Sequence, residues 1–292
     1  MRLRPLAFAC LIVASSASAQ DAAPNFPVLP PPDMATAGSA ATADTAQAPA
    51  SLDAAIAGDW CPEANRARDA HRHPRETLAF FGLRDDQTVI ELWPGGGWYT
   101  EILAPMLRER GQYIAASPAP PAGKTSAGND KLRARFAAQP EVFGKARLVE
   151  VDTAAPVLGP NGSADAVLTF RNVHNWVMDG KEAAMFKAIF EVLKPGGTLG
   201  VVDHRAKADQ PAEAMKTSGY LPEAYVIQLA EAAGFQLAAK SEVNANPRDT
   251  ADHPEGVWTL PPRLALGDKD RDKYSAIGES DRMTLRFVKP AR

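Results

Sequence analysis

Cysteine is scarce in this sequence: the 292 residues contain two, Cys10 and Cys61. Cys10 lies in an N-terminal segment that we expect to be removed, which would leave one thiol and therefore no internal disulfide. The sequence has no pair of closely spaced cysteines and no H-E-x-x-H motif, so it lacks the common patterns of a zinc site. Cys61 is expected to be a small, buried apolar residue.

The sequence also lacks a strong excess of charge of either sign. Its 32 basic and 35 acidic side chains give a formal net charge of −3. This balance gives no electrostatic reason to expect nucleic acid or an anionic membrane as a partner. Apolar residues make up 45% of the chain and charged residues 23%, which are near globular averages. We therefore expect a substantial core, in one large α/β domain or two small ones.

The apolar run at residues 6–14 is too short to span a bilayer. Two arginines precede it, and small residues follow at 17–19. This pattern is typical of a secretory signal peptide, here residues 1–19, with cleavage after Ala19. We expect a periplasmic or secreted protein with no stable membrane anchor after cleavage; an uncleaved anchor is the alternative.

Residues 20–50 are rich in Ala, Pro, Thr and Asp and poor in large apolar side chains, which is typical of a disordered linker. Residues 51–292 alternate helical and strand patterns, which predicts one domain with a mostly parallel sheet. Residues 261–275 are expected to form a long surface loop. Strands are expected at 88–92, 112–116, 146–151, 164–170, 198–203, 235–243 and 282–288, and helices at 63–71, 75–81, 99–110, 181–193 and 222–233.

A cluster of three glycines, Gly95, Gly96 and Gly97, follows the first expected strand and precedes the helix expected at 99–110. Glycine permits positive φ and lets a ligand approach the backbone closely. A strand, a glycine turn and a helix together place backbone N–H groups and a positive helix terminus beside a ligand. We therefore expect a small-ligand site at the carboxyl end of this strand.

The glycine turn, with VLKPGGT at 192–198, VVD at 201–203 and EAAGF at 231–235, resembles the class I S-adenosylmethionine (SAM) dependent methyltransferases over roughly residues 51–292. The strings PGGGWYTEILAP, FRNVHNW and VVDHRA resemble a branch of secreted predicted methyltransferases of unknown substrate. The resemblance implies an α/β fold with a Rossmann-like, seven-stranded, mostly parallel sheet and helices on both faces. It also implies SAM as the cofactor and a small-molecule acceptor.

The resemblance further implies which residues bind SAM. In this family an acid and a glycine turn hold the methionine part; here Glu91 matches the acid, and Trp93 stands where the family has its first glycine. Ser117 replaces the acid that usually accepts bonds from the ribose, and losing that charge-assisted bond would cost about one to two decades in affinity. Asp152 matches the position that contacts adenine, with a solvated turn residue as the alternative. The residues expected to bind SAM are Glu91, Trp93, Gly95, Gly96, Gly97, Tyr99, Ser117, Asp152, Arg171 and Asn172.

Two other nucleotide sites are disfavoured. A dinucleotide site needs G-x-G-x-x-G, and here Thr100 stands in place of the third glycine. It also needs an acid about 20 residues later, and that stretch reaches Ser117 instead. A phosphate-binding P-loop is excluded because no Gly-Lys-Ser/Thr follows the glycines.

Polar residues follow the fourth and fifth expected strands, whose carboxyl ends should meet at the ligand site. His174 or His204 is the expected general base, with Asp203 orienting a histidine or accepting a hydrogen bond. Arg171 or Arg205 is expected to pair with an anionic group of the substrate. The alternative is that His174 has a purely structural role.

Other side chains near the expected site have open roles. Zinc would suit His174, His204 and Asp203, but we expect a hydrogen-bonded pocket and no metal. Tyr220 is a candidate to reach the acceptor, and His253 lies in a loop that is a candidate to cap the pocket. The aromatic residues Trp93, Trp98, Tyr99, Trp176 and Trp258 are expected to shield a sulfonium, to stack on adenine or to pack as core.

A second class of function stays open: a catalytically inactive small-ligand-binding protein that retains the methyltransferase fold. Export from the cytoplasm, where SAM is made, favours this alternative, as do Trp93 and the missing ribose acid. The intact glycine turn favours an enzyme. In both cases we expect a small-molecule partner and no nucleic acid.

Overall fold

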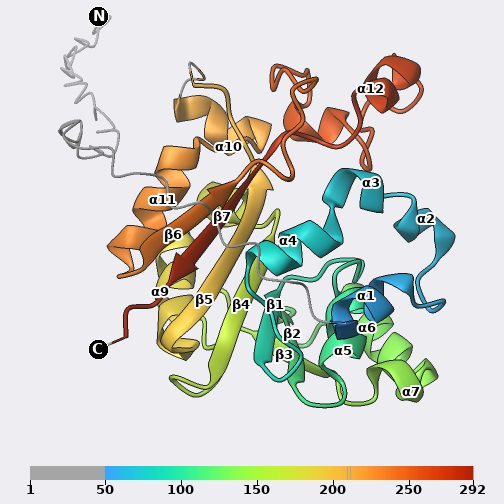
Figure 1. Cartoon of the computed structure of the whole chain (residues 1–292). Helices are drawn as coiled ribbons and strands as arrows, with labels where there is room; N and C mark the ends of the chain where they lie inside the picture. The colour runs from blue at the N-terminus through green and yellow to red at the C-terminus, as the bar shows by residue number, and fades with distance from the viewer. Residues whose placement is uncertain (1–49, 209, 211, 292) are drawn as a thin grey trace, which may run out of the picture. The chain divides into compact units, whose positions relative to one another are not determined.

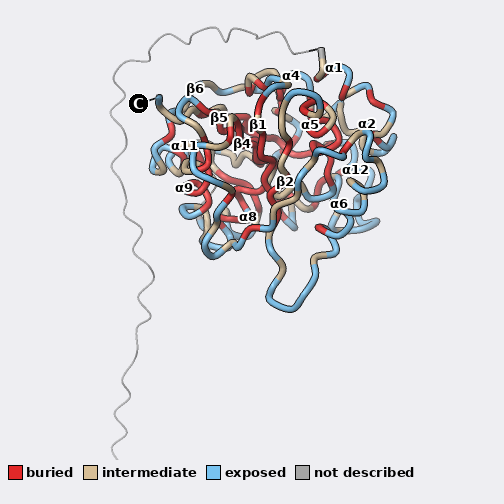
Figure 2. Tube along the Cα trace, turned by 90° about the horizontal axis from the view of Figure 1, so that it is seen from below, coloured by how far each residue is buried: buried red, intermediate tan, exposed pale blue. Residues whose placement is uncertain are grey.

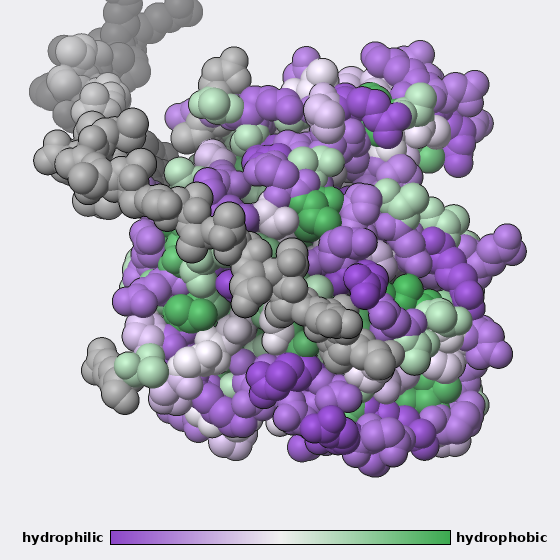
Figure 3. Space-filling model, in the orientation of Figure 1, coloured by the Kyte–Doolittle hydropathy of each residue, from purple (hydrophilic) through white to green (hydrophobic). Residues whose placement is uncertain are grey.

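The computed structural model describes residues 50–208, 210 and 212–291. The expected signal peptide at 1–19, with Cys10, and the expected linker up to residue 49 lie outside the described residues. None of the helices in the described ranges is long and apolar enough to cross a membrane. The visible face is mainly hydrophilic, with small and separate apolar patches (Figure 3).

Seven strands form one sheet in the order β3-β2-β1-β4-β5-β7-β6 (Figure 1). Neighbouring strands pair in parallel from β3 to β5, and β7 pairs antiparallel with both β5 and β6. The expected α/β fold with a Rossmann-like, mostly parallel sheet is therefore confirmed. The strands are β1 (Thr88–Leu92), β2 (Gln112–Pro118), β3 (Arg147–Val151), β4 (Ala164–Phe170), β5 (Leu193–His204), β6 (Gln236–Ser241) and β7 (Arg282–Val288).

Helices cover both faces of the sheet, and two apolar clusters fill the space beneath them. Val89 packs into one cluster and Ile90 into the other, because successive side chains of a strand point to opposite faces. Figure 2 shows the buried strands inside and exposed residues on the outer helices. One face carries α1 (Ala50–Ala57), α4 (Pro74–Phe80), α5 (Thr100–Leu107), α6 (Ala127–Ala138) and α7 (Pro140–Phe143), and the other carries α8 (Val173–Met178), α9 (Glu182–Val192) and α11 (Glu223–Ala232).

Several elements differ from the sequence-based expectation. The helix expected at 63–71 is two short helices, α2 (Glu63–Arg66) and α3 (Asp69–Arg72). The loop expected at 261–275 ends in α12 (Arg271–Ile277), and α10 (Met215–Ser218) precedes α11. These pieces have fewer than about two turns, too short to show a helical period in sequence, and packing rather than propensity stabilises such helices.

Strand β5 begins earlier than expected, because the Lys194–Gly197 turn joins the sheet. The Gly196 N–H donates to the carbonyl of Lys289 at 2.8 Å, and the Lys289 N–H donates to the carbonyl of Gly197 at 2.9 Å. Lys194 Nζ also lies 2.7 Å from Asp165 Oδ1. The glycines that end α9 therefore extend the sheet at the amino end of β5, away from the carboxyl ends that carry the site.

Candidate functional site

A cavity of about 330 Å³ lies outside the carboxyl ends of β1, β4 and β5. This is the edge at which ligands bind in open α/β sheets, and the volume is in the range of small-molecule sites. Its wall combines the glycine turn after β1, the start of α8, helices α2 and α3, and segments near the C-terminus. Among the lining residues are Arg68, Arg72, Glu91, Trp93, Gly95, Gly96, Trp98, Tyr99, Arg171, Asn172, His174, His204, Trp258, Arg263, Glu279 and Ser280.

The turn after β1 keeps a glycine-like backbone although it contains Trp93. Trp93 has a φ of 48°, in the left-handed region that glycine favours, and its N–H donates to the carbonyl of Ala116 at 2.7 Å. A Cβ built at Gly95 or Gly96 would meet no atom within 4 Å. The turn therefore presents bare backbone to the cavity, as the predicted cofactor site requires.

Glu91, at the end of β1, is a buried carboxyl group in the cavity wall. Its Oε2 accepts hydrogen bonds from Thr100 Oγ1 at 2.9 Å and from the Tyr113 hydroxyl at 2.5 Å. Burial raises the pKa of Glu91 to about 7, although both hydrogen bonds lower it. The carboxyl group can therefore change its charge near neutral pH.

The β4–α8 connection supplies the next part of the wall. Arg171 has a φ of 63°, and its N–H donates to the carbonyl of Val202 at 2.7 Å. Asn172 Nδ2 donates to the carbonyl of Leu92 at 2.9 Å, which ties the end of β4 to the end of β1. Arg171, Asn172 and the glycine turn thus meet at one cavity, as predicted.

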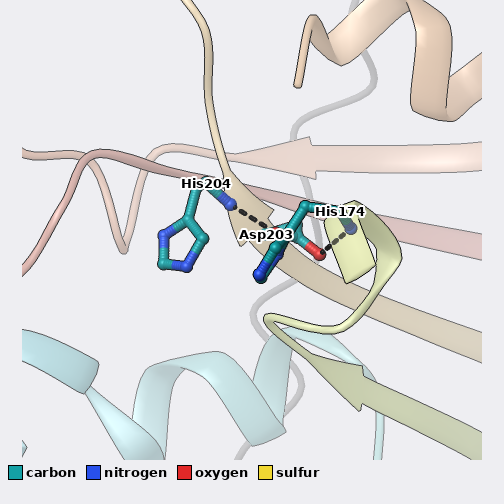
Figure 4. A group of neighbouring side chains, drawn as sticks. All are labelled: His174, Asp203 and His204. Atoms are coloured by element: carbon teal, nitrogen blue, oxygen red, sulfur yellow. Dashed lines mark hydrogen bonds and ion pairs between the residues drawn. The ribbon is translucent and has the colours of Figure 1, made fainter. Parts of the chain in front are cut away.

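Asp203 lies between the two candidate histidines (Figure 4). Its Oδ1 lies 2.8 Å from His174 Nδ1 and accepts the His204 N–H at 2.8 Å. Because a carboxylate accepts only, His174 Nδ1 carries the proton of this bond and the neutral ring keeps its lone pair on Nε2. His174 belongs to helix α8, which was not among the expected helices, and the expected orienting contact from Asp203 is present.

His204 is neutral because of its surroundings. Its Nδ1 lies 2.6 Å from Ser280 Oγ, and the two histidine rings have centroids 4.9 Å apart. Burial lowers the pKa of His204 well below its ordinary value, and the repulsion that a protonated His174 ring and Arg171 exert on the charged form adds to the shift. A neutral imidazole in a cavity wall can accept a proton.

The three groups also have the composition of a metal site. One ligand atom each from His174, Asp203 and His204 lies within 4.8 Å of the others. Both oxygens of Asp203 are already hydrogen-bonded, since Oδ2 accepts the Val173 N–H at 2.7 Å. A metal ion would share the Asp203 oxygens with these hydrogen bonds, and the absence of a metal stays a prediction.

Ser117 and Asp152 are two expected cofactor residues that do not line the cavity. The Ser117 hydroxyl donates to Asn129 Oδ1 at 2.6 Å. Asp152 is exposed, and its Oδ1 accepts the Ala154 N–H at 2.9 Å, which is the turn contact named as its alternative. Gly97 also lies outside the lining, with a φ of 81° that shapes the turn. Their contact with a cofactor stays a prediction.

Three further side chains that the sequence suggested for the pocket contact other groups. Arg205 binds Asp281 and Glu242, at 3.0 and 2.8 Å, and does not line the cavity. The Tyr220 hydroxyl donates to Asp249, and His253 Nε2 lies 2.8 Å from the same carboxylate. Arg171 is therefore the arginine of the expected pair that reaches the cavity.

The aromatic residues divide between core and cavity. Trp93, Trp98, Tyr99 and Trp258 line the cavity, whereas Trp176 packs into the core. The Tyr99 ring stacks on Phe170 with centroids 3.5 Å apart. Cys61 is buried as expected, and burial raises the pKa of its thiol to about 11, so it is not a reactive thiolate.

A charged cluster in the cavity wall was not predicted from the sequence. Glu279 Oε2 lies 3.1 Å from Arg72 Nε, 3.0 Å from Arg282 Nη1 and 3.9 Å from Arg171 Nη1, and its Oε1 lies 2.8 Å from Arg68 Nη2. Burial alone would raise the pKa of Glu279, but these guanidinium groups lower it to about 2. The one available signal was the arginine-rich stretch at residues 66–75, which matches no motif.

No protein-family model and no curated protein matches this sequence. Solved structures are similar in fold. A SAM-dependent methyltransferase from Aquifex aeolicus has a TM-score of 0.53 at 16% identity, covering 76% of this chain and 93% of its own. The cyclase SpnF has a TM-score of 0.53 at 17% identity, with 82% and 92% covered. The arsenic(III) SAM methyltransferase CrArsM of Chlamydomonas reinhardtii has a TM-score of 0.50 at 16% identity, with 83% and 74% covered. At such identities the similarity shows the fold, that of class I methyltransferases.

Proposed function

We propose that this chain is a SAM-dependent methyltransferase that acts on a small-molecule acceptor. The observation that carries the proposal is the composition of one cavity. The bare backbone of Gly95 and Gly96 lines it together with Glu91, and His174, whose ring is hydrogen-bonded to Asp203, lines it with His204. The fold of the structural neighbours supports this assignment, but a fold alone does not establish an activity.

The residues present fit the methionine part of SAM better than its ribose. Gly95 and Gly96 leave room for the methionine part at the backbone, and Glu91 and Asn172 supply polar groups beside it. When bound, SAM supplies a methyl group activated by a sulfonium. The ribose side fits less well, because the Ser117 hydroxyl already bonds Asn129. We therefore expect binding weaker than that of a site with a ribose acid.

The histidine pair is the proposed proton acceptor. His174 Nε2 takes the proton of the acceptor group, while the Asp203 carboxylate holds the Nδ1–H and stabilises the charged ring. Trp98, Tyr99 and Trp258 exclude water from the reacting groups. Alignment of donor and acceptor within one cavity is the main contribution that the protein makes to such a displacement.

We further propose that residues 1–19 direct the chain to the periplasm or the exterior, that 20–50 form a linker, and that 51–292 form the methyltransferase-like domain. The charged start, the short apolar run and the small residues at 17–19 support the signal peptide. The resemblance to secreted predicted methyltransferases supports the same location.

Calorimetric titration of the chain from Gln20 with SAM, and separately with S-adenosylhomocysteine, tests the proposal. We expect affinities in the micromolar range. The variant G96L should bind about tenfold more weakly or worse, because Gly96 lines the cavity, has no positive φ, and could take a Cβ that meets no atom of the fold.

The matched control is G128L, on the exposed side of α6, where a Cβ would meet one atom, Ser126 Oγ, at 3.8 Å. It should bind as the unchanged chain does. No heat with either ligand up to about 1 mM would overturn the methyltransferase assignment. The inactive ligand-binding protein would then be the better description of this fold.

A further inference from the structure

The cavity wall holds more positive charge than its own carboxylates neutralise. Four guanidinium groups, those of Arg68, Arg72, Arg171 and Arg282, surround the single carboxylate of Glu279. Three of the four, all but that of Arg282, line the cavity. Burial lowers the pKa values of Arg72 and Arg171, and repulsion from neighbouring arginines adds to the shift, while Glu279 opposes it.

One of these guanidinium groups also has an N–H donor without a hydrogen-bond acceptor. Arg72 is 2% exposed, yet its Nη2 has no hydrogen-bond partner among the described residues. Buried polar groups in folded proteins are nearly always hydrogen-bonded, and an unpaired charged donor is especially costly. The Arg72 guanidinium group lies over the Trp98 ring, but this nitrogen still has no hydrogen-bond acceptor; in a residue that lines the cavity, it points to an anionic ligand.

We propose that the acceptor molecule carries an oxyanion, a carboxylate or a phosphoryl group, which Arg68, Arg72 and Arg171 bind. The planar fork of a guanidinium group matches both anions and binds them through paired hydrogen bonds. This inference rests on the proposed function, and it narrows the acceptor from any small molecule to an anionic one.

The positive charge of SAM, the proposed methyl donor, also favours an anionic methyl acceptor. A sulfonium is a cation, and guanidinium groups in the same poorly solvated cavity would repel it. An acceptor anion seated on the arginines would offset this repulsion. His174 and His204 lie in the same cavity, so the anion would hold the rest of the acceptor within reach of the proposed bases.

The test is a calorimetric titration of benzoate, and separately of inorganic phosphate, into the chain from Gln20 saturated with S-adenosylhomocysteine. We expect at least one of the two anions to bind alongside the nucleoside, and the anion with the lower Kd shows whether the site prefers a carboxylate or a phosphoryl group. The variant R68Q should weaken that binding by about tenfold or more. Its matched control is R110Q, which removes the same charge from an exposed pair with Asp85 and should change affinity less than about twofold.

A second variant should change the affinity for the anion in the opposite direction. E279Q removes the carboxylate that competes for the arginines, so it should tighten anion binding by about tenfold. Three results would overturn the inference and leave the proposed function intact. They are no anion binding, anion binding that competes with S-adenosylhomocysteine, and anion binding that R68Q and E279Q leave unchanged. Failure of S-adenosylhomocysteine itself to bind would overturn the proposed function, and the acceptor assignment with it. Thermal unfolding of each variant confirms that it is folded.

Discussion

Two non-glycine residues with left-handed backbone stand at the ends of neighbouring strands. Trp93 follows β1 and Arg171 follows β4, with φ of 48° and 63°, and both line the cavity. Such residues cost roughly 1–3 kcal/mol each and persist where surrounding structure holds them. Here a backbone hydrogen bond to the next strand holds each one. The strain falls at the proposed site, as it does at many functional sites.

Comparison of R171G with R171A isolates this strain. Both variants remove the guanidinium group, but only glycine adopts a φ of 63° without a steric penalty. We expect R171G to have a free energy of unfolding about 1 kcal/mol higher than R171A. Chemical denaturation measures the difference. Equal stabilities would mean that the backbone relaxes when the side chain is removed.

The buried carboxyl group of Glu91 predicts a pH dependence of stability. Its folded pKa of about 7 lies above the ordinary value of 4.5, so the folded chain holds the proton more tightly than the unfolded chain. The free energy of unfolding should therefore fall as pH rises from about 4.5 to about 7. E91Q, which keeps an acceptor for Tyr113 and Thr100, should remove this fall, by about 3 kcal/mol in total.

Denaturant unfolding at several pH values measures the Glu91 effect as the difference between E91Q and the unchanged chain. Taking that difference cancels the other titrating groups. A difference that stays constant between pH 4.5 and 7 would contradict a raised pKa.

His204 should stay neutral well below pH 6.5. Burial and nearby positive charge disfavour its protonated form, so its ring resonances in an NMR titration should not move between about pH 8 and 6. The variant R171A should bring the transition to higher pH, because one of those positive charges is removed. A midpoint near 6.5 in the unchanged chain would count against His204 as a neutral base.

At the scale of elements, the cluster around Glu279 connects parts of the chain that the sheet does not join. Arg68 and Arg72 come from the segment that breaks into α2 and α3, Arg171 follows β4, and Arg282 begins β7. Arg72 also lies over the Trp98 ring, 4.7 Å from its centroid. Ion pairs through one carboxylate thus hold the N-terminal helices against the cavity.

Acid unfolding should reveal the contribution of Glu279. Its folded pKa of about 2 lies below the ordinary 4.5, so its stabilisation is present above pH 4.5 and is lost as pH falls toward 2. E279Q should cost about 3 kcal/mol at pH 7 and should lose this part of the acid dependence. Unfolding curves at pH 7 and pH 3 measure both effects. An equal difference at the two pH values would contradict the low pKa.

At the scale of the whole molecule, the site draws on residues from nearly the full length of the domain. The lining begins at Asn65 in α2 and ends at Ser280, two residues before β7. The carboxyl ends of β1, β4 and β5 bring these distant segments together at one edge of the sheet. The domain therefore has to be complete for the cavity to exist.

Export is the prediction that belongs to the whole chain. Expressed in a Gram-negative bacterium, the protein should be recovered outside the cytoplasm with Gln20 as its first residue. Mass spectrometry of the intact protein checks the cleavage. Recovery of the chain with its N-terminal segment retained in the membrane would support an uncleaved anchor instead.

Much of the fold was predictable because strands of a covered parallel sheet are continuous apolar runs. The structure places β1, β4 and β7 at the predicted bounds. Helix α8 was not predictable, since its six residues, Val173–Met178, are too few to show a period. The predicted strand-end residues Glu91, Arg171, Asn172, His174 and His204 do meet at one cavity, because parallel strands end at one edge.

The sequence by itself determined the fold class, the glycine turn and the pair of histidines, because these depend on local patterns and on the order of strands. Only the tertiary structure decided which polar side chains are free to bind a ligand. Ser117 is hydrogen-bonded to Asn129, and Arg205 forms an ion pair with Asp281. No local sequence pattern predicts these contacts. The arginine cluster around Glu279 joins residues more than 200 positions apart, and chain folding alone brings such charges together.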